Sequence, residues 1–545
     1  GNGKTIKNFC YIAEDVNAAF FSNLSNTTVK NITFSDAYVK AKTVSGAHLC
    51  GGACNASVVA DTVQNVNFEN VVVRGAVVYG WQTSTLAITA GTGNTDKNTP
   101  AVSLKKIKID HVTLGMTPDV IAEHPMLDLI ESAPSASGGI IADVGGHVSM
   151  EDSIKVLNLS VPDSISKIYK DVSGTEYIGN RYVGGIAGRF TPSARDADFT
   201  LDSIEVSADL SGLWVGGLFG RVSIDNDNLL GSSNFNITNA KVTLNSPVYL
   251  GNTGDNRNRY FGGLVGEWIW LRGKVVLSND TVDVSADWRG DKDFAGTAYM
   301  GGLAGFITGK EDGVSLVDVL AENNTVTAEM LTSSRNVYAG GILGRVNLEK
   351  DEIIGSGSLR ILKSNVKAKK SNLITTTAKE CILVNASYLV GNAVSLGGNV
   401  EIEQNHAEGI VYIANDRLTA PGGVGAEVGL TWSYGAKIYN NTSVGDLLVK
   451  KAVGAAGSKI CRGYVAGKLQ GNNSESKIKV RNNFHYGSID MGTYLAVGVL
   501  EVDSKEIPVS TWRNTYSSDL DVRYNYRNTL NSKADSTLSA DGELK

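Results

Sequence analysis

The first candidates for catalysis in this sequence are paired charged side chains. Cleavage of a polysaccharide by hydrolysis requires two carboxyl groups placed across the scissile bond. The sequence has no adjacent Asp-Asp pair, and Glu401 and Glu403 alternate along a strand-like segment just as Lys477 and Lys479 do. Residues two apart on a strand share a face, and solvated charges on an outer face account for both pairs. The sequence therefore indicates no catalytic residues, and we expect no enzyme activity.

Three short motifs suggest binding chemistry but lack the residues that would complete it. The run Asp225-Asn-Asp227-Asn begins like a calcium loop, yet no Gly and distal Glu follow at the required spacing, so we interpret it as a turn. Arg289-Gly290-Asp291 spells an integrin-binding tripeptide, which we interpret as coincidence in a Gly-rich chain. The six His and five Cys are scattered, except that Cys50 and Cys54 could be bonded to each other. We expect no metal and no cofactor.

The composition favours a folded, β-rich and exported chain. Of the 545 residues, 42% are apolar, 61 are Gly and only 9 are Pro, and the net charge is −6. That apolar fraction is enough for a core, and many Gly with few Pro suit tight turns between short strands. No basic stripe indicates a nucleic-acid partner, and no run of about 20 apolar residues indicates a transmembrane segment. A chain that starts at Gly1 without Met looks like a processed product, so we expect an export signal upstream.

One motif recurs along the middle of the chain. An aromatic residue and one variable residue precede Gly-Gly, an aliphatic residue, a second variable residue and Gly. Its five copies begin at Tyr182, Trp214, Tyr260, Tyr299 and Tyr338, and weaker copies occur at 138–142, 388–391 and 464–467. We interpret the paired glycines as turn residues, since Gly tolerates positive φ; they are Gly184, Gly185, Gly216, Gly217, Gly262, Gly263, Gly301, Gly302, Gly340 and Gly341.

The segments between these copies predict the fold. They alternate apolar and polar residues in short runs, separated by a polar kink that carries Asn, and this alternation is typical of strands. Repetition of such a unit predicts a solenoid. We therefore predict an all-β fold, a right-handed parallel β-helix with about three short strands per coil and loop insertions at one corner. Its body would occupy 1–510, as N-terminal coils (1–135), the Gly-Gly block (136–345) and degenerate coils (346–510), followed by a last coil and polar tail in 511–545.

Equivalent positions in stacked coils should form ladders. The aliphatic position of the motif predicts an interior row of Ile186, Leu218, Leu264, Leu303 and Ile342. Seven asparagines near one corner fit either an amide ladder or ordinary turns; they are Asn239, Asn279, Asn324, Asn365, Asn405, Asn441 and Asn483. Alternation of apolar and polar residues does not show which face of the strand the aromatic residue occupies, because both faces of the Gly-Gly strand carry apolar residues. The aromatic row lies either inside the body or beneath loops.

The G-N-G-K-T-I opening, the V-K-N-I-T-F strands and the G-G-L-x-G repeats resemble those of GLUG-repeat surface proteins, especially the large secreted or lipid-anchored ones of Bacteroidetes-type bacteria. The likeness covers most of the chain. It implies a parallel β-helix and an extracellular adhesin-like or surface-assembly role, and it brings no shared catalytic residues. A pattern that resembles the O-glycosylation signal of exported proteins in those bacteria occurs at Thr62, Ser153, Ser164, Ser203 and Thr281, with a looser match at Ser536.

Extra residues mostly precede the aromatic-Gly-Gly strands, which places them at one corner of each predicted coil. In solenoids, inserts that share a face commonly form the binding surface. The candidate contacts in these loops are Tyr249, Arg257, Arg259, Trp288 and Asp291. Loops that merely cover the body are the alternative.

These features favour a non-catalytic extracellular protein, adhesin-like or structural. It would bind a protein or glycan at the cell surface, or belong to an outer-membrane complex. The alternative is a carbohydrate-active enzyme, a polysaccharide lyase or hydrolase, or a glycan-binding accessory protein on the same scaffold. A passive spacer that holds another domain away from the membrane is a third possibility. The missing carboxylate cluster favours the first of these.

Overall fold

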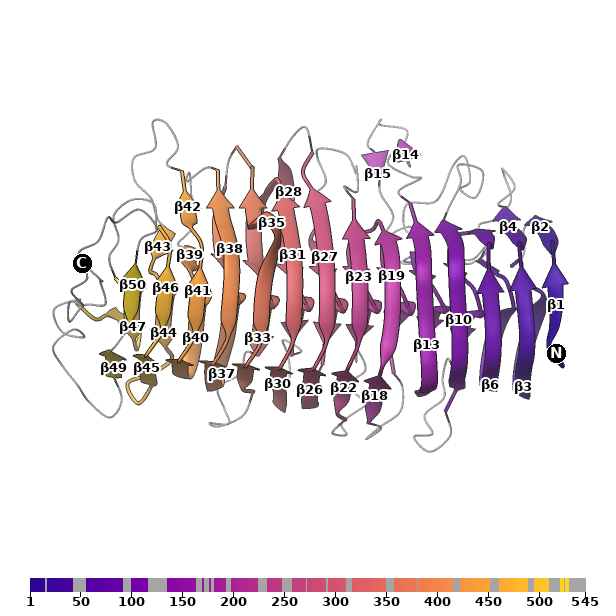
Figure 1. The fold of residues 1–545 in the computed structure, drawn as a ribbon, viewed down its shortest axis with the longest axis horizontal. Helices are drawn as coiled ribbons and strands as arrows, with labels where there is room; N and C mark the ends of the chain where they lie inside the picture. The colour runs from indigo at the N-terminus through magenta and orange to yellow at the C-terminus, as the bar shows by residue number, and fades with distance from the viewer. Residues whose placement is uncertain are drawn as a thin grey trace. The chain divides into compact units, whose positions relative to one another are not determined.

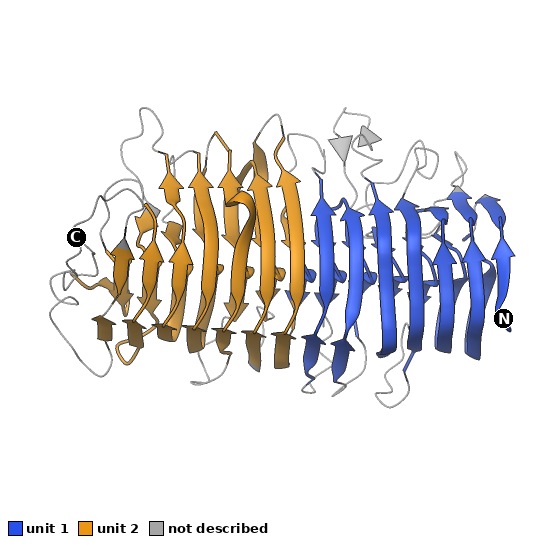
Figure 2. Cartoon of the chain, in the orientation of Figure 1, with its two compact units in different colours: residues 1–252, 263–268 blue, residues 253–262, 269–545 orange. Residues whose placement is uncertain are grey.

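Strands account for all the regular structure in the described part of the chain, where no helix occurs (Figure 1). The computed structural model describes residues 1–14, 17–42, 55–91, 100–115, 135–162, 169–170, 176–177, 181–192, 198–223, 233–247, 257–270, 272–290, 293–309, 316–348, 357–379, 381–414, 422–450, 460–488, 495–508, 520–523 and 525–528. The chain divides into two compact units (Figure 2). Unit 1 comprises residues 1–252 and 263–268, and unit 2 comprises residues 253–262 and 269–545.

Within each unit, strands of successive coils pair in parallel and in register, which confirms the predicted all-β parallel β-helix. Four ladders recur in both units. The short ladder that carries the aromatic position of the motif is called the aromatic sheet, and the three that follow it along the chain are called walls 1, 2 and 3. In unit 2, the coil that begins at Phe294 passes once through all four. The predicted aromatic-Gly-Gly strand is thus divided into two short strands, one in the aromatic sheet and one in wall 1, so this coil has four strands rather than about three.

In unit 1, the aromatic sheet consists of β5 (Ala56–Ser57), β8 (Thr83–Ser84), β11 (Ser135–Gly138), β16 (Arg181–Gly184) and β20 (Trp214–Gly216). Wall 1 contains β9 (Ala87–Ala90), β12 (Ile141–Val144), β17 (Ala187–Phe190), β21 (Phe219–Ser223) and β25 (Val265–Ile269). Wall 2 contains β18 (Phe199–Asp202) and β22 (Phe235–Thr238), and wall 3 contains β19 (Ile204–Leu210) and β23 (Lys241–Ser246). Four long strands bend through more than one wall, namely β3 (Phe21–Ser35), β6 (Ala60–Arg74), β10 (Val102–Gly115) and β13 (Val148–Val161). The remaining strands are β1 (Lys4–Lys7), β2 (Cys10–Glu14), β4 (Tyr38–Lys42), β7 (Val77–Tyr79) and the antiparallel pair β14 (Tyr169–Lys170) and β15 (Glu176–Tyr177).

In unit 2, the aromatic sheet consists of β24 (Arg259–Gly262), β28 (Phe294–Gly301), β32 (Ser334–Gly340), β36 (Leu383–Ser387), β39 (Gly422–Gly425) and β43 (Ile460–Arg462). Wall 1 contains β29 (Ala304–Thr308), β33 (Leu343–Leu348), β44 (Ala466–Gly471) and β47 (Val497–Val502), and wall 2 contains β26 (Arg272–Ser278), β30 (Leu316–Glu322), β34 (Leu359–Leu362), β45 (Lys477–Arg481) and β49 (Leu520–Arg523). Wall 3 contains β27 (Thr281–Trp288), β31 (Thr325–Thr332), β35 (Asn365–Thr376), β38 (His406–Ile413), β41 (Thr442–Val444), β42 (Leu447–Val449), β46 (Phe484–Tyr486) and β50 (Tyr526–Asn528). Strands β37 (Val390–Glu403) and β40 (Val428–Tyr439) run through walls 1 and 2, and β48 (Lys505–Glu506) pairs antiparallel with β47.

The predicted interior aliphatic row is confirmed. All five residues are at most 1% exposed. In unit 2, the backbone N–H of Leu303 donates to the carbonyl of Ile342 at 2.8 Å, so these side chains occupy equivalent places in successive coils. In unit 1, aromatic side chains fill the interior beside this row; they are Phe190, Phe199, Phe219, Phe235 and Trp268.

The paired glycines are required for space, which corrects the prediction that they supply positive φ. None of the ten predicted turn glycines has a left-handed backbone. A Cβ added to Gly301 would lie 1.9 Å from the carbonyl oxygen of Ala304. One added to Gly302 would lie 2.0 Å from the carbonyl oxygen of Gly341 and 2.5 Å from Cγ1 of Val326 in wall 3. The motif therefore marks the place where the chain approaches the opposite wall most closely.

The weaker motif copies after the Gly-Gly block have a different register from the predicted one. Gly340 pairs with Ser387, so Tyr388 stands beside Gly341, at the second glycine position rather than the aromatic one. Its side chain is fully buried. The coils with glycine at this position have valine opposite it in wall 3, whereas the coil of Tyr388 has Ala407 there. A smaller wall residue makes room for the larger ring, as close packing requires.

The seven asparagines occupy three different registers, and both open interpretations hold for different members. Asn239 and Asn279 have φ of 55° and 58° and are turn residues, while Asn365 is exposed. Asn405, Asn441 and Asn483 are buried and, with Asn525, form an amide ladder between coils. The side-chain N–H of each of the first three donates to the Oδ1 of the next, at 2.9, 2.9 and 2.8 Å. Asn324 is buried in the same row.

Removal of one ladder amide is expected to destabilise the fold. Asn441→Ala deletes the donor to the carbonyl of Ile402 and to Asn483, and the acceptor of Asn405. Buried groups left without partners cost more than a simple exchange of hydrogen bonds, so we expect a loss of about 3 kcal/mol in urea unfolding. The exposed Asn365→Ala should change stability by less than about 0.5 kcal/mol. Equal effects of the two substitutions would contradict a structural role for the ladder.

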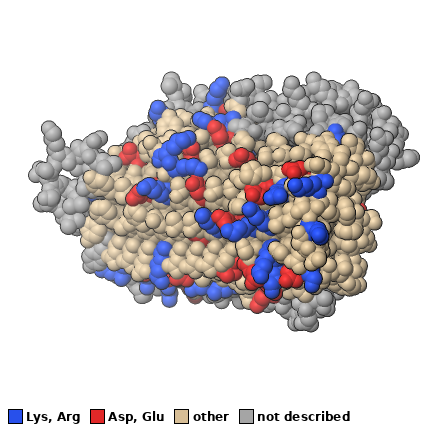
Figure 3. Space-filling view, turned by 45° about the vertical axis from the view of Figure 1, so that its right-hand side comes forward, with Lys and Arg blue, Asp and Glu red and all other residues tan. Residues whose placement is uncertain are grey.

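Charges on the outer faces of the walls are paired between neighbouring coils. On the face shown in Figure 3, basic and acidic side chains lie beside one another rather than in separate patches. In unit 1, Nζ of Lys155 lies 2.8 Å from a carboxylate oxygen of Glu205 in the next coil. In unit 2, Nζ of Lys363 lies 3.2 Å from a carboxylate oxygen of Glu322. Such exposed pairs add little stability individually, but opposite charges directly across a ladder favour this register over a shifted one.

Candidate binding surface

The corner between wall 3 and the aromatic sheet is where the predicted binding loops begin and end. In unit 2, β27 ends at Trp288 and β28 begins at Phe294, and the next examples of this connection vary in length. Extra residues also occur at a second corner, between walls 1 and 2, where β29 ends at Thr308 and β30 begins at Leu316. Insertions are therefore not confined to the one predicted corner.

Two of the five predicted contacts are unsuitable because they belong to the core. Trp288 is 0% exposed at the end of β27, and Arg259 is 2% exposed in β24, with its guanidinium carbon 3.7 Å from the centroid of the Phe294 ring. Neither side chain can meet a partner at the surface. Arg257 is half-buried just before β24. Tyr249 and Asp291 lie outside the described residues.

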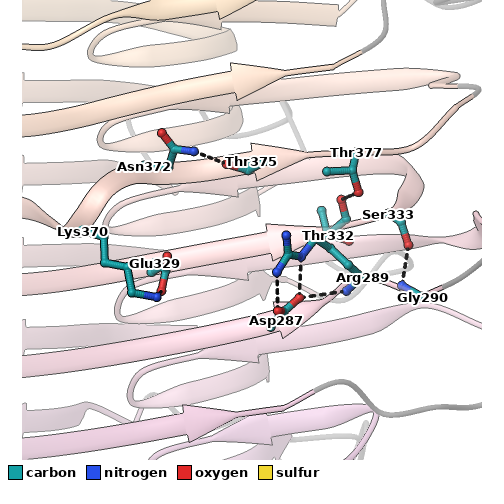
Figure 4. A network of polar contacts seen from close by, with 10 residues as sticks. All are labelled: Asp287, Arg289, Gly290, Glu329, Thr332, Ser333, Lys370, Asn372, Thr375 and Thr377. Carbon is teal, nitrogen blue, oxygen red and sulfur yellow. Dashed lines mark hydrogen bonds and ion pairs between the residues drawn. The ribbon is translucent and has the colours of Figure 1, made fainter.

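The backbone and side chains at this corner of unit 2 are held by polar contacts (Figure 4). Arg289 donates to both carboxylate oxygens of Asp287, at 2.8 and 2.6 Å, and these hydrogen bonds lower the pKa of Asp287. The N–H of Gly290 donates to Oγ of Ser333 at 3.1 Å. The arginine of the integrin-type tripeptide is therefore engaged within the corner, which is consistent with coincidence.

A bulge in β35 lies beside this corner. Ala328 pairs with Ala368 and Met330 with Ile374, so β35 carries four more residues than β31 at this point. The bulge is anchored to preceding coils because Nζ of Lys370 lies 2.8 Å from a carboxylate oxygen of Glu329 (Figure 4). Nζ of Lys369 likewise lies 2.8 Å from a carboxylate oxygen of Asp283. Bulges re-aim side chains and are frequent near functional sites. Here the bulge and the corner together give the adjoining loops a fixed base.

The aromatic row lies on the outer face of the aromatic sheet, which settles the open alternative. Ala298 and Met300 are 0% exposed and flank Tyr299, so Tyr299 points away from the interior. In unit 2, Tyr299 stacks on Tyr260 at 4.9 Å and on Tyr338 at 5.2 Å, with the rings nearly parallel. Their faces are occupied by one another. This row therefore stabilises coil stacking and offers no free ring face to a ligand.

In unit 1 the same row is joined to wall 1 by polar contacts. Trp214 donates its indole N–H to Glu267 at 2.8 Å, and Arg221 lies 3.0 Å from the same carboxylate oxygen. Arg221 also donates to the hydroxyl of Tyr182 at 3.3 Å. Burial raises the pKa of Tyr182, and Arg221 opposes that rise. Because the donors and the carboxylate bind one another, this group has a structural role and connects the aromatic sheet to wall 1.

A buried polar chain occupies the interior of unit 2. Glu427 hydrogen-bonds Ser443, and Oγ of Ser443 lies 3.0 Å from Nδ1 of His485. Glu427 is 1% exposed, and the other two residues are 0% exposed. Burial raises the pKa of Glu427 to about 8, while burial and the nearby Arg527 lower the pKa of His485 to about 3. Both groups are therefore neutral at pH 7.

The alternating charges predicted to be solvated point outward. Glu401 lies 3.7 Å from Lys437, and Glu403 accepts a hydrogen bond from Asn440 at 3.4 Å. Both glutamates are half-buried on the outer face of β37, and Lys477 is exposed in β45. The two carboxylates thus face cations or amides of adjacent coils rather than each other across a bound substrate. Within the described residues, no three His, Cys, Asp or Glu side chains gather closely enough to hold a metal ion.

No protein-family model, curated protein or solved structure matches the chain. The family resemblance of the repeats therefore stays a prediction. Among the described segments, none forms a helix that is long and apolar enough to cross a membrane.

The predicted glycosylation positions differ in accessibility. Ser153, Ser203 and Thr281 are exposed, and Ser203 stands at a corner with φ of 57°. Thr62 is half-buried and shares a hydrogen bond of 3.1 Å with Thr89. Ser164 and Ser536 lie outside the described residues. Modification at these positions stays a prediction.

Sequence reasoning missed the buried polar chain. Its members lie 16 and 42 residues apart, so no local motif connects Glu427, Ser443 and His485. A signal was nevertheless present. Ser443 and His485 each stand two residues after a ladder asparagine, at a position that alternation places inside.

Proposed function

We propose that the chain is a non-catalytic surface scaffold, adhesin-like or structural, which binds through loops at the corner between wall 3 and the aromatic sheet. The observation that carries this proposal is the anchored base of that corner in unit 2. Arg289 is engaged by Asp287, and the N–H of Lys379 donates to Asp293 at 3.0 Å. A fixed base reduces the entropy lost when a loop binds a partner. The surface location rests on the resemblance of the repeats to GLUG-repeat proteins.

Pairing of the outer charges supports a binding role over a catalytic one. A general acid and base must both be free to exchange protons with substrate. In unit 2, the carboxylates of Glu329, Glu401 and Glu322 each face a lysine of a neighbouring coil. Such pairs fasten coils to one another. A carbohydrate-active enzyme on the same scaffold is the competing hypothesis and is an outcome of the test below.

Replacement of one loop is expected to abolish binding without affecting the fold. Residues 248–256, which include Tyr249, would be replaced by a Gly-Ser segment of equal length in the full chain. The matched control replaces residues 349–356, at the corner between walls 1 and 2. Binding of labelled protein to intact cells and to a glycan array should fall at least 10-fold for the first variant only, with unchanged thermal unfolding.

The same samples would be assayed for reducing ends released from polysaccharides. Equal binding by both loop variants would contradict the assigned corner. Release of products by the wild type, abolished by one Asp or Glu substitution, would establish the enzyme hypothesis instead.

A further inference from the structure

The outer face of wall 3 changes character along unit 2. The first outward residue after the buried ladder is Thr325 in β31, Asn365 in β35, His406 in β38 and Thr442 in β41. In the last two coils the same row continues with Phe484 in β46 and Tyr526 in β50, and Tyr486 stands two residues beyond Phe484 (Figure 1). A polar row thus becomes aromatic over adjacent strands.

These three aromatic side chains face outward. They alternate with Ser443, His485 and Arg527 in their own or the adjoining strands, and those residues are at most 6% exposed inside the unit. Phe484, Tyr486 and Tyr526 are each half-buried. Within the described residues, none of the three stacks on another ring or lies under a cation. No described residue therefore covers their ring faces, in contrast to those of the stacked tyrosines in the aromatic sheet.

The buried amide ladder fixes the backbone of two of the three rings, Phe484 and Tyr526. The N–H of Phe484 donates to the carbonyl of Asn441, and the N–H of Tyr526 donates to the carbonyl of Asn483, both at 2.8 Å. Phe484 and Tyr526 therefore each follow directly after a ladder asparagine, and Tyr486 lies two residues further along the same strand as Phe484. Side chains held on paired strands lose little freedom when a ligand binds.

The size of this aromatic area favours a small ligand over a protein. Its rings lie on two adjacent strands, and two strands at about 4.8 Å spacing and three residues at about 3.3 Å cover only about 100 Å². A stable protein partner requires roughly 800 Å² on each side. The area is also part of a flat sheet, whereas apolar small molecules usually need a concave pocket. An extended ligand with flat faces suits this geometry best.

The surrounding charges favour a neutral ligand. In the same outer row of wall 3, Glu408 pairs with His406 at 3.0 Å and with Lys367 at 3.8 Å. An anionic ligand would thus find basic side chains that are already paired with a carboxylate. Sugar rings carry C–H groups that suit the electron-rich faces of aromatic rings, and their hydroxyls can bond the phenol groups of Tyr486 and Tyr526.

We propose that Phe484, Tyr486 and Tyr526 form an aromatic platform on wall 3 that binds a neutral oligosaccharide. This inference rests on the proposed function only in taking the chain to be a binding protein, because the platform and the loop corner are different surfaces. It names the ligand class of a second site.

The platform is tested by titration calorimetry on the full chain with neutral hexasaccharides of β-1,4-linked glucose, mannose or galactose, and with anionic polygalacturonate. At least one neutral probe should bind, with affinity unchanged by 0.5 M salt. Phe484→Ala and Tyr526→Ala should each weaken binding at least 10-fold. Thr325→Ala, in the same row of β31, should have no effect. Thermal unfolding checks the fold, and Phe484→Leu, which keeps apolar volume without a ring face, replaces any alanine variant that unfolds.

Three results would overturn the platform. They are no binding of any neutral probe by the wild type, unchanged binding in the ring variants, and binding of polygalacturonate alone. Concentration-dependent dimerisation that the ring variants abolish would assign the surface to self-association instead. The 248–256 variant should keep oligosaccharide binding, so loss of the loop function and loss of the platform are distinguished.

Discussion

The buried polar chain should contribute a pH profile with a plateau between about pH 4.5 and 6.5, where stability is greatest, and a decline on each side. Glu427 is responsible for the alkaline decline. Its pKa is raised by burial from 4.5 to about 8, so between these values the folded protein keeps a proton that the unfolded chain has released. Raising the pH then favours unfolding. For Glu427 alone the loss between pH 4.5 and pH 8 is on the order of 4 kcal/mol, and only the part above pH 6.5 appears as a net decline.

His485 produces the acid decline with the opposite sign. Its pKa falls from 6.5 to about 3 in the folded protein, because the ring is buried and lies near Arg527. Between these values the unfolded chain takes up a proton that the folded protein does not, so lowering the pH favours unfolding. From pH 4.5 to 6.5 the two slopes cancel, which produces the plateau.

Glu427→Gln isolates the alkaline decline, because the amide keeps a polar partner for Ser443 and cannot ionise. In urea unfolding the variant should match the wild type within about 1 kcal/mol at pH 4.5 and exceed its stability by on the order of 4 kcal/mol at pH 8. The difference between the two proteins removes the contributions of other titrating groups. Parallel pH profiles for both would show that the carboxyl of Glu427 has the same pKa in the folded and the unfolded protein, and would contradict the raised pKa.

Gly302→Ala should be among the most damaging small substitutions in unit 2. The added Cβ would lie 2.0 Å from the carbonyl oxygen of Gly341 and 2.5 Å from Val326, so backbone and wall must both move. Overpacking of this kind costs typically 1–3 kcal/mol, and we expect about 3 kcal/mol or more because a backbone atom is involved. Thermal unfolding measures the change.

A second substitution separates the two clashes at Gly302. Val326→Ala removes the contact with the wall but leaves the carbonyl of Gly341 in place. The double variant Gly302→Ala with Val326→Ala should therefore remain at least as unstable as Gly302→Ala alone. Full recovery in the double variant would place the whole cost in side-chain packing and contradict the backbone clash.

The fold was predictable because its signal repeats. Five copies of one motif and strict alternation between them specify parallel coils, and the interior row from Ile186 to Ile342 follows from the copies alone. The register of Tyr388 was not predictable from the motif. That residue is placed by the space opposite it, where Ala407 replaces a valine, and such complementarity spans residues far apart in sequence.

The candidate site was less predictable than the fold. Trp288 and Arg259 stand next to loop segments in sequence, which suggested surface contacts. Trp288 instead takes an inward position in the regular alternation of β27, and the guanidinium of Arg259 packs on Phe294, so both side chains lie in the core. The sequence alone does not show that Phe484 and Tyr526 are neighbours. The strand register places them side by side in one outward row, next to Thr442.

The buried amides of Asn405, Asn441, Asn483 and Asn525 all donate in the same sense along the row. The row is therefore a vector that points from Asn405 towards Asn525. A duplicated or transplanted coil can join such a series only in the parent orientation and only as a complete turn of the chain. Gene recombination could thus lengthen or shorten this protein by whole turns, while a fractional insertion would interrupt the vector and leave buried amides facing apolar neighbours.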